Sequence, residues 1–373
     1  MEWGEKKLGF GMMRLPMIEE NGEKRVDHEQ VCRMVDRFLE EGFCYFDTAH
    51  GYIEEKSEIA VRECLVKRHP RESYILTNKL SGIYFETQGD ILPLFEKQLE
   101  ACGVEYFDYY LHHALDAEKF VKFQNCHAFE IVKGLKAEGK VRHIGISFHD
   151  KAPVLDRILT AQPEIEVVQI QFNYTDYEDP DVQARQVYEV CRRHNKTVLI
   201  MEPVRGGRLA NLSARAGEVL SQLQGGSQAS YAVRFAACFE GVAMVLSGMS
   251  SLEQMEDNLS YMKDFRPLEE REFDVIWQVA EVLRQEKLIG CTACRYCVEG
   301  CPGKISIPEV LECINDRYQD KIEEAAQKYA AYTNAGGKAS GCIACTACEK
   351  ICPQHIPISK LMKKAVRVFE ENK

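Results

Sequence analysis

The chain lacks the features of a membrane or secreted protein. Among its 373 residues, no apolar stretch approaches the roughly 20 residues that a helix needs to span a bilayer. The opening residues, MEWGEKKLGF, contain no apolar signal segment. We therefore expect no membrane association and a cytoplasmic location.

An excess of positive charge is also missing. Lys and Arg together number 47 against 58 Asp and Glu, which gives a formal net charge of −11. Binding to a nucleic-acid backbone depends on cations that neutralise phosphates. The charge balance therefore predicts no nucleic-acid partner.

Cysteine, by contrast, is abundant, and half of the 16 cysteines fall into two runs of one pattern. The runs are Cys291-x2-Cys294-x2-Cys297-x3-Cys301-Pro302 and Cys342-x2-Cys345-x2-Cys348-x3-Cys352-Pro353. This is the spacing of bacterial ferredoxins, so the duplicated run predicts two [4Fe–4S] clusters.

The expected ligand sets follow from this resemblance to ferredoxins. In two-cluster ferredoxins the fourth cysteine of each run ligates the other cluster. Carried over, one cluster is held by Cys291, Cys294, Cys297 and Cys352, and the other by Cys342, Cys345, Cys348 and Cys301.

Zinc and disulfides are the alternatives for the cysteine runs. Structural zinc usually takes two separated cysteine pairs, and disulfide frameworks are typical of short secreted chains. Both are therefore less favoured. The other eight cysteines are scattered singly and are expected to pack as small apolar side chains in a reducing cytoplasm.

Eight short β-rich runs recur before residue 265, with helical patterns between them. The runs are Leu8–Arg14, Cys44–Ala49, Tyr74–Leu80, Asp108–Ala114, Arg142–Phe148, Val167–Asn173, Val198–Pro203 and Val242–Met249. Strands that alternate with helices predict a parallel sheet, and eight such units match an α/β fold of the (β/α)8 TIM-barrel type. A doubly wound sheet is the alternative, but no Gly-x-Gly-x-x-Gly follows the first run.

Helical periodicity supports this organisation and continues beyond the barrel. It covers His28–Glu41, Lys56–Arg68, Ile91–Cys102 and Val182–His194, and later Pro267–Lys287, Ile307–Tyr318, Asp320–Tyr332 and Ile358–Glu371. We predict a barrel over residues 1–265, a linker helix over 266–287 and a small, mainly helical ferredoxin-like domain over 288–373.

Four side chains suited to proton transfer stand where neighbouring predicted strands end. Asp47 lies at the end of the second strand and Tyr52 just beyond it, Lys79 lies at the end of the third and His113 at the end of the fourth. Chemistry in such barrels occurs at the C-terminal ends of the strands. A Lys cation lowers the pKa of a nearby Tyr, an Asp holds the Lys, and a His donates to a carbonyl oxygen. A plain salt bridge between Asp47 and Lys79 is the structural alternative.

These residues resemble the aldo-keto reductase family, in its bacterial branch. The segment Asp47-Thr48-Ala49-x-x-Tyr52 is similar to the family's Asp-x-Ala-x-x-Tyr, and the strand from Asp108 to His113 is similar to its Asp-Leu-x-Leu-x-His. The resemblance covers residues 1 to about 265, and it implies the catalytic set Asp47, Tyr52, Lys79 and His113 acting on a small-molecule carbonyl. His112 is then expected to be a hydrogen-bonded core residue.

The resemblance also implies NAD(P)H bound in extended form. It places Ser147 and Gln169 at the carboxamide, Met201 under the nicotinamide ring, and Pro203 and Arg205 in a loop over the pyrophosphate. A thioether can pack against a ring face, and an Arg can neutralise a phosphate.

At the adenosine end the resemblance places Gly248, Ser250, Gln254 and Asn258. Gly248 and Gln254 stand where many NADP-preferring members carry Lys and Arg. Because these cations are missing, a strong preference for NADP is not expected, and a flavin remains an alternative cofactor.

Three functions are consistent with these patterns. A hydride carries two electrons, whereas each cluster passes one at a time. The first interpretation is a carbonyl reductase whose clusters exchange electrons with an external ferredoxin-like one-electron carrier or have a structural role. The second is a flavin- or ferredoxin-linked electron-transfer reductase that does not use nicotinamide. The third is a redox-sensing or partner-binding protein. The complete catalytic set favours the first.

Overall fold

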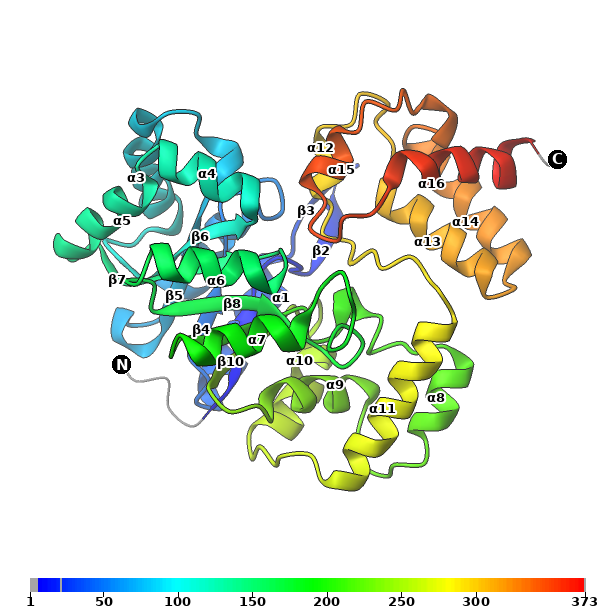
Figure 1. The fold of residues 1–373 in the computed structure, drawn as a ribbon, viewed down its shortest axis with the longest axis horizontal. Coiled ribbons are helices and arrows are strands. Elements are labelled where there is room, and N and C mark those ends of the chain that lie inside the picture. The colour runs from blue at the N-terminus through cyan, green and yellow to red at the C-terminus, as the bar shows by residue number, and fades with distance from the viewer. Residues whose placement is uncertain (1–5, 21, 372–373) are drawn as a thin grey trace. The chain divides into compact units, whose positions relative to one another are not determined.

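The computed structural model describes residues 6–20 and 22–371, and its main feature is a closed barrel of eight parallel strands (Figure 1). The strands neighbour one another in the order β1-β10-β9-β8-β7-β6-β5-β4. They are β1 (Leu8–Gly11), β4 (Tyr45–Asp47), β5 (Ile75–Ser81), β6 (Phe107–Leu115), β7 (Val141–Phe148), β8 (Val167–Gln171), β9 (Thr197–Met201) and β10 (Val242–Ser247). Each overlaps one of the eight predicted runs, so the predicted (β/α)8 barrel is confirmed.

The interior of the barrel is filled by side chains. Every residue of β4, β5 and β8 is buried. Side chains from six strands form one buried cluster: Tyr45, Ile75, Tyr109, Leu111, Val167, Leu199, Met244 and Leu246. A filled barrel leaves space for chemistry only at its ends, and in this fold the active site lies at the C-terminal end.

Helices follow the barrel strands along the chain. They are α1 (His28–Glu40), α2 (Lys56–Val61), α3 (Ile91–Cys102), α4 (Ala117–Asn125), α5 (Ala128–Ala137), α6 (Ala152–Ala161), α7 (Ala184–Arg193), α9 (Gln228–Ala237) and α10 (Leu252–Met262). The Asp27 side chain accepts from Gln30 N and so caps α1. The helix predicted over residues 56–68 is α2 followed by a π-helical turn, Arg62–Val66.

A hairpin that the sequence analysis did not predict follows β1. It pairs β2 (Met17–Glu20) with β3 (Glu23–Val26) in antiparallel register. The β2 side chains are all exposed, and Gly22 has a φ of +81°. Because at least half of the residues in each strand are charged, the hairpin differs in sequence from the buried runs of the barrel.

The chain divides into two compact units, Met1–Val204 with Leu223–Ile276, and Arg205–Gln222 with Trp277–Lys373. The helix α11 (Glu270–Gln285) stands where the linker helix was predicted, and the division falls within it. The segment Arg205–Gln222, which contains α8 (Ala214–Leu220), belongs to the second unit although it precedes β10 in sequence.

The C-terminal unit is mainly helical, as predicted. Its further helices are α12 (Tyr296–Glu299), α13 (Ile307–Tyr318), α14 (Ile322–Ala335), α15 (Ala347–Ile351) and α16 (Ile358–Ala365), with a π-helical turn over Val366–Glu371. Ile305, Leu311, Ile314, Tyr329 and Met362 lie in its buried core, against which cysteines of both runs pack.

Short 3-10 turns complete the secondary structure of both units. They lie at Arg71–Ser73, Gly82–Tyr84, Gln88–Asp90, Arg205–Gly207 and Ala339–Gly341. Across the part of the chain that the structure describes, no helix is both long enough and apolar enough to cross a bilayer.

Candidate active site and cluster cavities

The four predicted catalytic residues meet at the C-terminal end of the barrel. Asp47 is the last residue of β4, and Tyr52 lies in the loop that follows. Lys79 lies near the end of β5, where the register pairs Ser81 with His113 of β6. Because β4, β5 and β6 are parallel neighbours, their ends present these side chains on one face.

Lys79 is the centre of the set. Its side chain is fully buried, and its Nζ donates to Asp47 Oδ1 at 2.6 Å, to Thr48 O at 2.8 Å and to the Tyr52 hydroxyl at 3.2 Å. Burial lowers the pKa of Lys79, and the Asp47 carboxylate acts against that shift. The pair therefore holds a cation beside the phenol of Tyr52.

Tyr52 and His113 face each other across the same site. Their ring centroids are 6.0 Å apart and the planes lie at 75°. The Ser81 hydroxyl is hydrogen-bonded to Nδ1 of His113. Burial, followed by the Lys79 cation, lowers the pKa of His113 well below 6.5, although part of the side chain remains accessible. His113 is therefore neutral near pH 7.

The neighbouring His112 has a different environment. It is fully buried, stacks on Phe129 at 4.2 Å between ring centroids, and its Nδ1 donates to Gly145 O at 3.1 Å. Burial lowers its pKa to about 4. His112 is a core residue, as the sequence suggested.

A buried polar network behind Lys79 was missed by the sequence analysis. The fully buried Glu58 accepts from Asn78 Nδ2 at 2.8 Å and lies 2.7 Å from His50 Nδ1. Gln98 Nε2 donates to the carbonyl of Lys79 at 2.9 Å. These contacts fix the β5 backbone that carries Lys79. Glu58 and Gln98 lie in helical patterns, where polar residues ordinarily face solvent.

Two of the predicted carboxamide ligands lie beside the catalytic set. The register pairs Ser147 of β7 with Gln169 of β8, and both are buried. Ser147 Oγ accepts from Ala114 N at 2.7 Å, and Gln169 Nε2 donates to Asp47 Oδ2 at 3.2 Å. Gln169 therefore connects the predicted cofactor site to the buried ion pair.

Two further residues predicted to contact the cofactor lie at the end of the neighbouring strand. Met201 is the last residue of β9, which pairs with β8, and Pro203 follows it. The strand end that carries Met201 therefore adjoins the strand that carries Gln169.

The predicted adenosine-binding residues form a second polar group. Ser250 Oγ donates to Arg14 O, and its backbone N donates to Gln254 Oε1, both at 2.7 Å. Asn258 Nδ2 donates to Gln254 O at 2.8 Å, whereas its Oδ1 is buried without a hydrogen-bond partner. An unpaired buried acceptor is unusual and is the kind of atom that a bound ligand satisfies.

Arg14 is a cation near this end that the sequence analysis did not identify as a site residue. It forms an ion pair with Glu202 Oε1 at 3.3 Å. A Cβ on Gly248 would lie 3.7 Å from its Nη1. Barrel closure brings β1 and β10 together, which sequence distance alone does not reveal.

Arg205, predicted to face the pyrophosphate, belongs to the other compact unit. There, a Cβ on Gly290, the residue before the first cysteine run, would lie 2.9 Å from its Nη2. The structure thus groups Arg205 with the cysteine runs and not with the other predicted cofactor residues.

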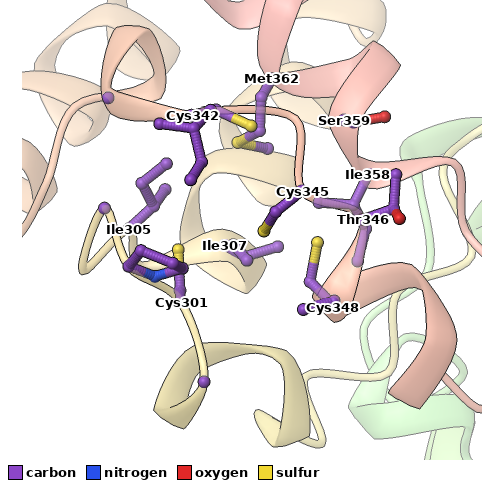
Figure 2. A pocket seen from close by; sticks show the side chains of 16 residues that line it. Cys301, Ile305, Ile307, Cys342, Cys345, Thr346, Cys348, Ile358, Ser359 and Met362 are labelled. Carbon is purple, nitrogen blue, oxygen red and sulfur yellow. The ribbon is translucent and has the colours of Figure 1, made fainter.

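The eight run cysteines surround two cavities, each bounded by three cysteines of one run and the fourth of the other. Figure 2 shows the Cys301 cavity, lined by Cys301, Cys342, Cys345 and Cys348. The Cys352 cavity is lined by Cys291, Cys294, Cys297 and Cys352. Apolar side chains such as Ile305, Met362 and Leu311 complete the walls.

The donor set fits an iron–sulfur cluster better than the alternatives. No disulfide joins any of the sixteen cysteines, all of which lie within the described residues. Within residues 6–20 and 22–371, no group of three or more His, Cys, Asp or Glu is placed to hold a single metal ion. Four cysteines spread around a cavity match a cluster, since each thiolate binds a different iron at the corners of the cube.

Comparison with known proteins finds a different family model for each of the two parts of the chain. Residues 7–281 match the model of the aldo/keto reductase family, and residues 290–357 match a 4Fe-4S dicluster domain. A 9,11-endoperoxide prostaglandin H2 reductase from Trypanosoma cruzi is 27% identical over 203 residues, which are 54% of this chain and 66% of that relative. A glyoxal reductase from Bacillus subtilis is 25% identical over 219 residues, which are 58% of this chain and 68% of that relative.

Solved structures share the barrel fold. A holo aldo-keto reductase from Bacillus halodurans aligns with a TM-score of 0.61 and 21% identity, over 75% of this chain and 95% of that one. An aldo-keto reductase from Klebsiella pneumoniae, described in complex with NADPH, aligns with a TM-score of 0.58 and 20% identity, over 74% and 90% of the two chains.

Proposed function

This chain belongs to the aldo/keto reductase family and carries a C-terminal 4Fe-4S dicluster domain, and from that premise we propose that it reduces a small-molecule carbonyl, or oxidises the corresponding alcohol, with Tyr52 as the general acid or base. The observation that carries the proposal is the 3.2 Å contact between the buried Lys79 ammonium and the Tyr52 hydroxyl. A phenol ordinarily has a pKa near 10, too high for efficient proton transfer at neutral pH. The adjacent cation stabilises the phenolate and makes proton donation easier.

His113 is suited to polarise the carbonyl. In the neutral tautomer that carries its proton on Nε2, Nδ1 accepts from the Ser81 hydroxyl, and Nε2–H donates to the substrate oxygen. Tyr52, at 6.0 Å between ring centroids, then protonates the same oxygen as negative charge develops.

The residues at the barrel end fit a nicotinamide cofactor. NAD(P)H would supply the hydride. Ser147 and Gln169 would hold its carboxamide, and Met201 with Pro203 would pack against it. The unpaired Asn258 Oδ1 would accept from the adenine amino group. Arg14 adds a cation beside Gly248, but Glu202 balances its charge, so NADP and NAD are both accommodated.

The two cavities of the C-terminal unit would hold two [4Fe–4S] clusters with the crossed ligand sets described above. When bound, each cluster would pass one electron at a time, which is the unit that an external one-electron carrier exchanges.

An anaerobic assay with a panel of aldehydes and ketones tests the proposal. Replacement of Tyr52 by Phe should lower kcat for NAD(P)H-dependent reduction by roughly 10²- to 10⁴-fold, the usual contribution of a general acid. Tyr188→Phe is the matched control, because that hydroxyl donates to Glu240 O on the outside of the barrel. Undiminished activity in Tyr52→Phe would refute the assigned role.

Cofactor content is measured on the same preparations. Mass spectrometry of the acid extract should detect nicotinamide nucleotide and no flavin, and iron analysis should give about eight iron atoms per chain. A stoichiometric flavin would instead favour electron transfer within a barrel that does not use nicotinamide.

A further inference from the structure

The duplicated cysteine run permits a position-by-position comparison of the two cluster loops. The residue after the first cysteine is Thr292 in one run and Ile343 in the other. Thr292 is 3% exposed, whereas Ile343 is 70% exposed, the largest value among the exposed large apolar side chains of the described residues. The position after the first cysteine therefore has opposite environments in the two loops.

The burial of the first loop has a local cause. A Cβ on Gly206 would lie 2.5 Å from Thr292 O, so the backbone of Arg205–Gly207 lies directly on this loop. Arg208 Nη1 also donates to Ile289 O at 2.7 Å. The covering segment continues the chain directly from β9, whose last residue is Met201.

The second loop is open to solvent. Gly341, Ile343, Ala344 and Cys345 are all exposed, and Cys345 lines the Cys301 cavity (Figure 2). An exposed large apolar side chain beside a redox site is a feature of surfaces that bind another molecule.

Charge distinguishes the two loops in the same way. Residues 338–367, which contain the second run, have six Lys or Arg and one Glu, whereas the equivalent residues 287–316 have three Lys or Arg and four Asp or Glu. In residues 338–367 every exposed Lys, Arg, Asp or Glu side chain is cationic, because Glu349 is partly buried and its carboxylate accepts from Ser359 N. A chain with a net charge of −11 therefore has a basic surface at this cluster.

The basic side chains lie close in the chain to residues that line the Cys301 cavity. Helix α16 contributes Ser359 and Met362 to the wall of the Cys301 cavity and presents Lys360 and Lys363 to solvent. Lys350, also exposed, follows Cys348 by two residues. Five exposed residues either line the Cys301 cavity or lie within two residues of its lining in the chain, and we call them the Ile343 face: Ile343, Cys345, Lys350, Lys360 and Lys363.

We propose that the Ile343 face binds an acidic protein that carries one electron at a time, and that the cluster of the Cys301 cavity exchanges electrons with it. The inference rests on the proposed cluster content of the C-terminal unit. In each encounter the reduced carrier loses one electron and the oxidised cluster gains it, with no bond formed and no proton required.

Charge complementarity sets the expected behaviour. Interfaces of electron carriers are small and transient, so opposite charges act mainly on the association rate. Attraction between a basic face and an acidic carrier raises that rate by roughly 10- to 1000-fold at low ionic strength, and salt screens it.

The test uses the anaerobically purified full-length protein with its clusters. The probe is a small acidic ferredoxin, reduced before stopped-flow mixing, and its affinity is measured separately by calorimetry. The double variant Lys360→Glu/Lys363→Glu should associate at least about 10-fold more slowly at low ionic strength, and the difference should vanish in high salt. Ile343→Glu should weaken binding at every salt concentration.

The controls separate this proposal from the cluster assignment. Arg317→Glu reverses an exposed charge on α13, away from both cavities, and should leave association within about twofold of the unaltered protein. Iron content and the low-temperature EPR signal of the variants must match those of the unaltered protein. If Ile343→Glu loses iron, the association rate of the Lys360→Glu/Lys363→Glu variant alone tests the proposed binding face. A chain without iron refutes the proposed function itself.

Several outcomes would overturn the proposal. These are unchanged association in the lysine variant, equal rates with a basic c-type cytochrome, or binding of anionic lipid vesicles or duplex DNA in place of the ferredoxin. Slower association confined to the acidic probe and abolished by salt would support it.

Discussion

The ammonium nitrogen of Lys79 lies 2.6 Å from Asp47 Oδ1, and both side chains are buried. Desolvation of two charges is costly, and the cost is offset only when each remains paired. The pair is therefore a poor device for stability alone. The position of the pair beside Tyr52 instead indicates a role in the chemistry of the site.

Substitution of Asp47 by Asn should separate stability from catalysis. The single variant leaves a buried ammonium uncompensated and should lower the free energy of unfolding by about 3–5 kcal/mol. Addition of Lys79→Met removes that charge and should restore much of the stability, while carbonyl reduction stays lost because Tyr52 has no neighbouring cation. Urea unfolding followed by circular dichroism, with parallel assays, measures both. Recovery of activity in the double variant would contradict the role of Lys79.

Pairs of cysteine substitutions should reveal the crossed ligation. Cys301 and Cys342 line the same cavity. Cys301→Ala, Cys342→Ala and the double variant should therefore each leave about four iron atoms per chain. Cys301→Ala with Cys352→Ala affects both cavities and should remove nearly all iron. Cys313→Ala, a buried cysteine outside the runs, is the control. Uncrossed ligation predicts instead that Cys301→Ala combined with Cys294→Ala removes only one cluster.

The sequence was sufficient to predict the features that local patterns encode. The β5 run Ile75–Ser81 is entirely buried, and its place in the alternation of short strands and helices marks it as a barrel strand. Asp47, Lys79 and His113 could be predicted to meet because adjacent parallel strands end on one face. Closure of the predicted barrel also implies that the first and last strands are neighbours, but the orientation of the Arg14 side chain toward Gly248 depends on tertiary packing that no local pattern encodes. The grouping of Arg205 with the cluster unit depends on how Gly206 fits Thr292, which is a tertiary contact that no local pattern encodes.

His112 should make the stability of the barrel depend on pH. Its pKa is about 4 in the folded chain and near 6.5 when unfolded, because burial disfavours the charged ring. Between these values the unfolded state binds more protons, so the free energy of unfolding falls as the pH drops from about 6.5 to about 4, by about 3 kcal/mol in total. His112→Leu should lack this contribution. The difference between the two proteins, measured by urea unfolding across this range, cancels effects that both share, and parallel stability curves would contradict the prediction.

Gly206 should be required for the cluster of the Cys352 cavity. Its φ is +67°, and an added Cβ would lie 2.5 Å from Thr292 O, next to Cys291. Gly206→Ala must therefore displace the loop that supplies three ligands, and iron should fall from about eight to about four atoms per chain. Gly207 is a matched control, because its φ is +97° and no atom lies within 4 Å of an added Cβ. Gly207→Ala incurs the backbone strain without the clash, so it should lose stability but keep its iron. If both variants lose iron equally, strain in the turn and not contact with Thr292 would be the cause.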